Sequence, residues 1–221
     1  MTDSADGDKD AISSDSMPEG WELAALGDVL EERNVRVKDL DPSHQEDAVL
    51  LSLTKNFGLI PQNQRFSKRI ATSDISNYKV VKNGWIVYNP YVIWEGAIHA
   101  YKGDGAGIVS PVYVVWEAVG ADAAYLDFIL RTPNMLKVYL TFCSGTVKRR
   151  RSIRKTAFRD IKVALPRSSE QKSIAQVLTS VEKAQEATEE VSGASWDLRI
   201  LCWNISSTMA LYPKMKLSLF P

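Results

Sequence analysis

A heptad repeat of apolar residues in the C-terminal part of the 221-residue chain constrains its fold most. Its members alternate three and four residues apart and are Ile174, Val177, Val181, Ala184, Thr188, Val191, Ser195, Leu198, Cys202, Ile205, Met209 and Tyr212. This spacing puts one seam along one side of a helix, and coiled coils cover such a seam with a second helix. The pattern predicts one helix over residues 169–212, ended by Pro213 and roughly 60–65 Å long. A rod of that length is typical of a spacer or an assembly element.

The remaining composition is that of a globular protein with a substantial core, because 45% of the residues are hydrophobic and 24% are charged. We expect residues 1–17, which are acidic and polar, to be a disordered leader. They resemble neither a secretory signal nor a transit peptide, and no apolar run is long enough to cross a bilayer. Only two cysteines, Cys143 and Cys202, are present, which favours a reducing compartment. We therefore expect a cytoplasmic protein that does not bind membranes.

The net charge of zero conceals a strong segregation of charge along the chain. Residues 1–50 contain fourteen acidic and four basic side chains. Residues 148–162 contain eight basic side chains and a single acid, Asp160, so this segment carries a charge of +7. Such a segment attracts a polyanion whatever the charge of the whole chain. The alternative is a solvated loop or a nuclear-type signal.

Periodicity before the heptads predicts an α+β fold, a mixed α/β domain over residues 18–168. We expect strands at 49–53, 85–88, 97–101, 112–116 and 161–165, and helices at 74–78, from 122 and from 133 to 140. An exposed loop or hairpin is expected at 54–69. The glycine-rich residues 103–107 are interpreted as a turn between strands, because the extended Ile108-Val109-Ser110-Pro111 follows them instead of a helix. Residues 213–221 form a tail.

No convincing catalytic or metal site emerges from the sequence. Asn89-Pro90-Tyr91 is similar to the Asn-Pro-Pro-aromatic signature of amino-methyltransferases, but one proline and the S-adenosylmethionine-binding unit are missing. His99 lies in an apolar strand without a neighbouring carboxylate, which favours a packed or surface histidine over a catalytic base. Cys143 is interpreted as a small core residue, and no Cys/His cluster suggests a metal.

Two segments are candidates for contact with double-stranded DNA. The first is the basic segment with Lys148, Arg149, Arg150, Arg151, Arg154 and Lys155, whose side chains suit phosphates and guanine edges. The second is the polar loop with Lys55, Asn56, Gln62, Asn63, Gln64 and Arg65, whose amides suit adenine. A loop of this composition is equally common on surfaces that bind nothing.

Five motifs in order resemble the specificity subunit of type I restriction–modification systems. They are Trp85-Ile-Val-Tyr-Asn-Pro90, Trp94-Glu-Gly96, Gly107-Ile-Val-Ser-Pro111-Val-Tyr113, Leu165-Pro166 and Glu170-Gln171-Lys-Ser-Ile174-Ala175. The resemblance covers about residues 18–190 and corresponds to one target-recognition domain followed by one long helix. The third and fifth motifs together are quite specific, whereas either one alone is weak.

The resemblance implies a DNA-reading protein without its own chemistry or cofactor. Its domain reads one half of a bipartite site, and its helix pairs with another helix to set the distance between the halves. The implied partners are a DNA adenine methyltransferase subunit that binds S-adenosylmethionine and an ATP-driven restriction and translocase subunit. Family members usually carry two domains and two helices, so this chain is either a half-subunit that dimerises through its helix or a truncated copy.

Two other classes of function stay open from the sequence alone. One is a small nuclease or methyltransferase that uses the Asn89-Pro90-Tyr91 corner. The other is an interaction module whose basic segment binds an acidic protein surface. The first would turn over DNA without a partner subunit, and the second would bind DNA without sequence preference.

Overall fold

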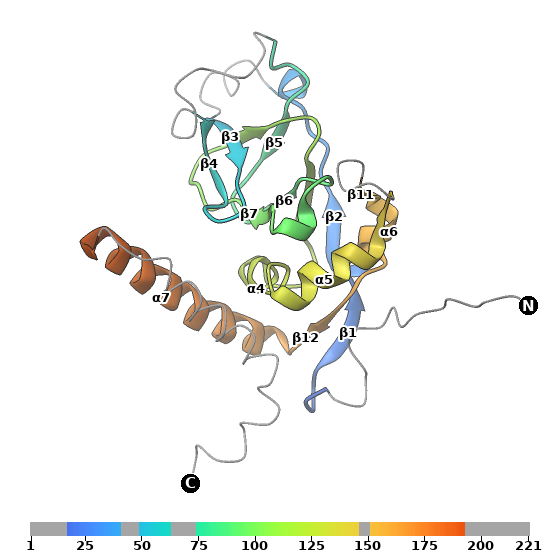
Figure 1. Ribbon diagram of the computed structural model, residues 1–221, viewed down its shortest axis with the longest axis vertical. Coiled ribbons are helices and arrows are strands. Elements are labelled where there is room, and N and C mark those ends of the chain that lie inside the picture. The colour runs from blue at the N-terminus through green and yellow to red at the C-terminus, as the bar shows by residue number, and fades with distance from the viewer. Residues whose placement is uncertain (1–16, 41–48, 63–73, 146–150, 193–221) are drawn as a thin grey trace, which may run out of the picture.

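The computed structural model describes residues 17–40, 49–62, 74–145 and 151–192 (Figure 1). Two four-stranded sheets form its centre. One has the order β2 (Leu30–Glu32), β9 (Val114–Ala118), β6 (Ile86–Tyr88) and β7 (Ile98–Ala100), and all its neighbours are antiparallel. The other has the order β4 (Leu59–Pro61), β3 (Val49–Leu53), β8 (Gly107–Val109) and β5 (Lys79–Val81), with β3 and β8 parallel.

Two small ladders and the helices complete the described part. β1 (Glu22–Ala25) pairs with β12 (Lys162–Leu165), and β10 (Cys143–Ser144) pairs with β11 (Ser152–Ile153). The helices are α1 (Leu26–Val29), α4 (Ala123–Ile129), α5 (Pro133–Phe142), α6 (Lys155–Arg159) and α7 (Ser168–Ser192). Single 3-10 turns form η2 (Val37–Asp39) and η3 (Ile93–Glu95).

The helices predicted near residues 122 and 133 are confirmed as α4 and α5. Capping residues explain why each helix begins where it does. The side chain of Asp122 accepts a hydrogen bond from the Tyr125 amide at 2.9 Å and begins α4. Thr132 plays the same part for α5, and Pro133 occupies the first turn, where its missing N–H costs nothing. Of the loop or hairpin expected at 54–69, the described part is a hairpin, since β3 turns back into β4, and residues 63–69 lie outside the described residues.

The structure corrects two expectations and adds two elements. Residues 74–78 form a turn and not a helix, because the Asp74 carboxylate accepts the Ser76 amide at 2.8 Å, a local bond that competes with helical ones. The strand expected at 112–116 begins at Val114. The basic segment contains β11 and α6, which charge alone did not predict.

Two apolar clusters hold these elements together. The larger one packs α4, α5 and α6 on the β2-β9-β6-β7 sheet, and its largest fully buried side chains are Tyr88, Trp116, Tyr139 and Phe158. The smaller one lies between the two sheets and includes Leu51, Val81, Val87 and Val115. The first turns of α7 belong to the larger cluster, because Ala175 is buried in it and Ile174 packs against it.

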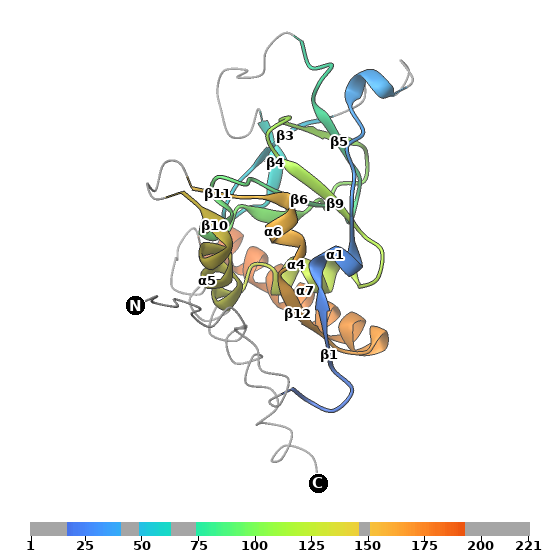
Figure 2. The same ribbon diagram turned by 90° about the vertical axis from the view of Figure 1, so that its right-hand side faces the viewer.

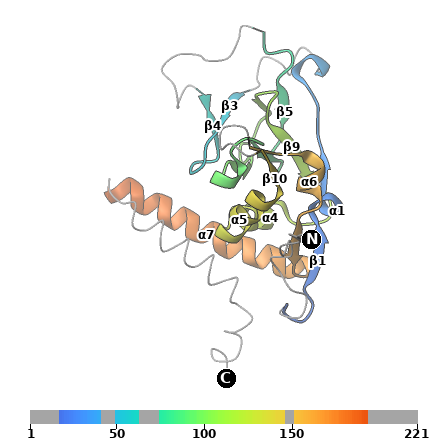
Figure 3. The same cartoon turned by 45° about the vertical axis from the view of Figure 1, so that its right-hand side comes forward.

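α7 is a single helix of 25 residues. It packs against α4 at its beginning, and its far end extends beyond the globule (Figures 1 and 3). This confirms a long C-terminal helix as far as Ser192. Residues 193–212, over which the same helix was predicted to continue, lie outside the described residues.

Candidate nucleic-acid interface

The described half of the basic segment is fixed to the core. The Ile153 amide donates to the Pro90 carbonyl at 3.1 Å, and Phe158 is completely buried three residues after Lys155. Figure 2 shows the β10–β11 ladder and α6 beside β6 and β9. Arg151 is half-buried, whereas Arg154 and Lys155 are exposed. Lys148, Arg149 and Arg150 lie outside the described residues.

Two further cations lie next to this segment that the sequence did not single out. Arg36 forms a β-bridge with Lys79, and the Lys79 ammonium donates to the Tyr113 carbonyl at 2.6 Å. Burial lowers the pKa of Lys79, and the positive charges of Lys155 and Arg36 lower it further against the opposing effect of Glu32. We call Arg36, Arg154 and Lys155, together with the buried Lys79, the basic face.

Glu32 partly neutralises the positive charge of the basic face. Lys155 pairs with Glu32 at 2.6 Å, while both side chains remain partly exposed. An exposed pair of this kind contributes little to stability and is readily exchanged for a phosphate. The sequence gives little indication that Lys79 belongs to a basic surface. Lys79 stands alone before the apolar pair Val80-Val81, away from the basic segment.

The polar loop forms a tight hairpin tip at residues 54–58. The Thr54 amide donates to the Gly58 carbonyl at 2.8 Å, and Gly58 has a φ of +67°, a conformation that favours glycine. Lys55 pairs with Glu95, and Asn56 is exposed. Gln62 is half-buried just after β4. Asn63, Gln64 and Arg65 lie outside the described residues.

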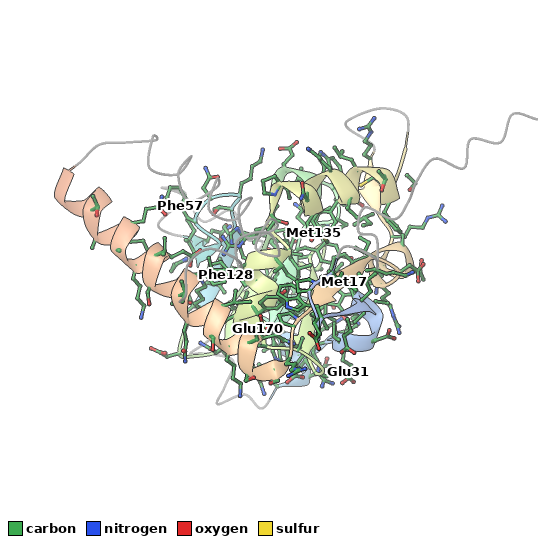
Figure 4. The ribbon with its side chains drawn as sticks, turned by 90° about the horizontal axis from the view of Figure 1, so that it is seen from below. Met17, Glu31, Phe57, Phe128, Met135 and Glu170 are labelled. Atoms are coloured by element: carbon green, nitrogen blue, oxygen red, sulfur yellow. The ribbon has the colours of Figure 1, made fainter. Side chains whose placement is uncertain are left out.

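The hairpin tip faces α7 across a cleft of about 540 Å³. Lys55, Asn56 and Phe57 line one wall, and Leu178 and Val181 of α7 line the other. Figure 4 shows Phe57 and Phe128 on the side that faces α7. The basic face does not line this cleft, so among the described residues the two predicted DNA-binding segments occupy different surfaces.

A charged cluster occupies the floor of the cleft between α4 and α7. The Asp127 carboxylate, fully buried, lies 3.0 Å from Arg131 and 3.5 Å from Lys102, and it accepts the Ala100 amide at 2.7 Å. Burial by itself would raise the pKa of Asp127, but Arg131, His99, Lys102 and the amide outweigh burial and lower it. Asp127 therefore stays ionised, and it joins α4 to β7.

The residues on which an enzymatic function would rest are engaged elsewhere. The Asn89 side chain accepts the Tyr91 amide at 3.1 Å, and the Pro90 carbonyl accepts Ile153. His99 is buried with Nε2 3.1 Å from the Lys55 carbonyl, and burial, aided by Arg131, lowers its pKa to about 4. His99 is therefore a packed, neutral histidine, which agrees with the prediction of a packed or surface histidine.

The described ranges contain neither a potential metal cluster nor a helix suited to a membrane. No three His, Cys, Asp or Glu side chains there come together as a potential metal site. No helix there has the length and apolar character needed to cross a membrane.

The predicted heptad seam divides between two environments. Ile174 packs on the core and Val181 lines the cleft, whereas Val177, Ala184 and Thr188 are exposed. Val177 is 55% exposed. The side chain of Val191 and the residues Leu198, Cys202 and Ile205 lie outside the description. A row of exposed small apolar and hydroxyl side chains therefore runs along α7, beside the face that packs on the globule.

Comparison with known proteins identifies the fold. No family model matches the sequence, and no curated protein matches it. Among solved structures, a chain of a type I restriction–modification system aligns with 87% of this chain at 17% identity and a TM-score of 0.50. The HsdS subunit of Thermoanaerobacter tengcongensis aligns with 89% at 15% identity and a TM-score of 0.51. The described chain has the fold of a type I specificity subunit, and it spans about half the length of these structures, 46% and 45%.

Proposed function

We propose that this chain is a DNA-recognition subunit that directs partner subunits of a type I restriction–modification system to a bipartite site. The specificity-subunit fold carries the proposal, since the likeness extends over nearly nine tenths of the chain. The basic face supports it, because phosphate contacts dominate the affinity of proteins for DNA. In this proposal Arg154 and Lys155 bind phosphates, and Lys148 to Arg150, which precede them in the chain, read bases. The polar loop borders the cleft on a different surface, so base contacts by this loop require the DNA to reach that surface as well.

The chemistry belongs to the partners in this proposal. A DNA adenine methyltransferase subunit binds S-adenosylmethionine, and an ATP-driven restriction and translocase subunit cuts. Co-expression with an adenine methyltransferase subunit, followed by mapping of methylated adenines, tests the proposal. We expect methylation at one split sequence. Methylation or cleavage of DNA by the purified chain alone would favour a stand-alone enzyme.

Replacing both Arg154 and Lys155 with alanine is expected to weaken DNA binding without unfolding the protein. Both side chains are exposed, and each lost phosphate contact should reduce the slope of log affinity against log salt concentration by about one. Fluorescence anisotropy over a salt series measures this slope. Lys172→Ala is the matched control, because it removes an exposed cation from α7, away from the basic face. Equal slopes for the double variant and the control would contradict the role of the basic face.

We further propose that two copies pair through α7 and give a two-fold dimer that reads a palindromic bipartite site. The exposed row of Val177, Ala184 and Thr188 supports this pairing. A small polar residue in such a seam, here Thr188, favours one register of the paired helices.

Ala184→Glu is expected to abolish the dimer and leave the monomer folded. Position 184 is exposed in the single chain, so a carboxylate there disturbs only a helix that packs on the seam. Light scattering after size-exclusion chromatography measures the mass at several concentrations. Gln176→Glu is the matched control, because it adds the same charge at an exposed position outside the seam. If the unmodified protein is a monomer at tens of micromolar, with and without DNA, this pairing is wrong.

A further inference from the structure

α7 is held to the globule by polar contacts at two places. The first is Gln171, which is buried although its side chain is an amide. Its Oε1 accepts the Asp122 amide at 2.8 Å, and its Nε2 donates to the Pro166 carbonyl at 2.8 Å. Both ends of the side chain are thereby satisfied, and with the buried Ala175 they fix the beginning of the helix.

The second place is Glu182, which lies on the same side of the helix eleven residues later. Its two carboxylate oxygens accept from different cations, Arg131 at 3.0 Å and Lys102 at 2.9 Å. Both cations also pair with the buried Asp127, and both lie over the ring of Phe128, at 5.3 Å and 5.7 Å from its centroid. Glu182 therefore closes onto a cluster that is itself fixed in the core.

The spacing of these two places determines what they do. Eleven residues of helix separate them by about 16 Å, and the described helix continues for roughly 15 Å beyond Glu182. Two fixed points determine the direction of a rod, whereas one leaves it free to pivot. Between them α7 borders the open cleft, where Leu178 and Val181 line the wall. A pivot of about 10° at Ala175 would displace Ser192 by roughly 4–5 Å, which exceeds the rise of about 3.4 Å per base pair.

We propose that Glu182 is a positioning residue that fixes the direction in which α7 leaves the recognition domain, acting through Arg131 and Lys102. Glu182 and Lys102 are both partly exposed, so their pairing contributes little to the stability of the fold. What it supplies is direction, because a carboxylate shared by two cations is satisfied in only one orientation of the helix. This proposal rests on the proposed function. Its consequence is that Glu182 restricts the distance allowed between the two halves of the DNA site.

Measuring the direction of α7 requires no DNA. In a protein with Cys143 and Cys202 replaced by serine, spin labels are attached at Val112→Cys in the globule and Ala187→Cys on α7, both at exposed positions. Pulsed electron paramagnetic resonance then gives the distribution of the distance between the labels. We expect a single narrow distribution in this parent, and a distribution shifted or broadened by at least about 4 Å after Glu182→Ala, from the same pivot geometry.

Two further variants keep the test decisive. Glu186→Ala removes the same side chain one turn later on the wall of the cleft, where no ion pair is formed among the described residues, and should leave the distribution unchanged. Lys102→Gln weakens the cluster from the globule side and should broaden the distribution in the same way as Glu182→Ala. The proposal is overturned if Glu182→Ala and Glu186→Ala give the distribution of the parent.

A second readout separates this proposal from the proposed function. With the methyltransferase partner, methylation is measured on DNA sites whose two halves are moved apart or together by one base pair. We expect the unmodified protein to accept one spacing and Glu182→Ala to accept neighbouring spacings as well. Absence of methylation by every protein would count against the proposed function and leave the distance result intact. Unchanged spacing preference in Glu182→Ala would remove the link between the helix direction and the DNA site.

Discussion

Replacing Phe158 with alanine is expected to lower the free energy of unfolding by about 3–5 kcal/mol. Phe158 is completely buried, and its ring centroid lies 4.6 Å from that of Tyr88, 5.6 Å from Trp116 and 6.2 Å from Tyr139. Removing the ring leaves a cavity among three large aromatic side chains, which have little freedom to close it. Urea denaturation followed by tryptophan fluorescence measures the loss.

Phe158→Leu is the control for this prediction, because it keeps an apolar side chain and leaves a smaller cavity. We expect it to lose clearly less stability than Phe158→Ala. Phe158 holds α6 and the basic segment against the core. Phe158→Ala should therefore also weaken DNA binding more than Lys172→Ala, which removes an exposed side chain away from the basic face. A loss below about 1 kcal/mol would show that the basic segment is not held by this packing.

Replacing Asp127 with alanine is expected to cost a comparable amount, about 3–5 kcal/mol. The carboxylate is fully buried, so its removal leaves Arg131 with Glu182 as its remaining acid and leaves the Ala100 amide without its acceptor. The loss has two sources, because the partly buried Arg131 keeps only half of its acidic partners and the buried Ala100 amide has no acceptor in place of water. Thermal and urea unfolding measure the change.

Asp127→Asn separates the contribution of the negative charge from that of the hydrogen bond with the Ala100 amide. Asparagine retains an oxygen for the Ala100 amide but removes the negative charge from Arg131 and Lys102. We therefore expect a loss smaller than that of Asp127→Ala but still well above that of an exposed carboxylate such as Glu186→Ala. If both Asp127 variants are as stable as the unmodified protein, the charged cluster does not hold α4, β7 and α7 together.

Several local elements were predictable because the information for them is local. Asp122 and Thr132-Pro133 mark the starts of α4 and α5 through side chains that bond within their own first turn. Val49–Leu53 and Ile86–Tyr88 are rich in aliphatic and aromatic residues and form β3 and β6 as expected. The Glu170-Gln171 motif was recognised as a family feature, but its physical role as a buried amide contact was not visible.

Other elements were missed because their partners are distant in the sequence. β2, β10 and β11 contain two or three residues each, too few for any periodicity, and pairing across the sheets defines them. Lys79 and Arg36 join the basic face only because β5 lies beside residue 36. The spacing of Asp127 and Arg131, four residues apart at the end of α4, is typical of an ion pair. Lys102 and Glu182 come from distant segments, and no spacing in the sequence predicts that they join this pair.

The heptad repeat shows most clearly which features depend on the local sequence and which depend on the tertiary structure. Its spacing by itself predicted one helix with an apolar side over residues 169–212, because helical periodicity depends only on neighbours three and four residues apart, and the helix is confirmed as far as Ser192. Which side of that helix packs on the globule was decided by the tertiary structure. Gln171 is held inward by hydrogen bonds to the Asp122 amide and the Pro166 carbonyl, and Glu182 by its ion pairs with Arg131 and Lys102. Ala175 is buried in the apolar core. Contacts between distant segments depend on the whole arrangement of the chain, and no local pattern records them.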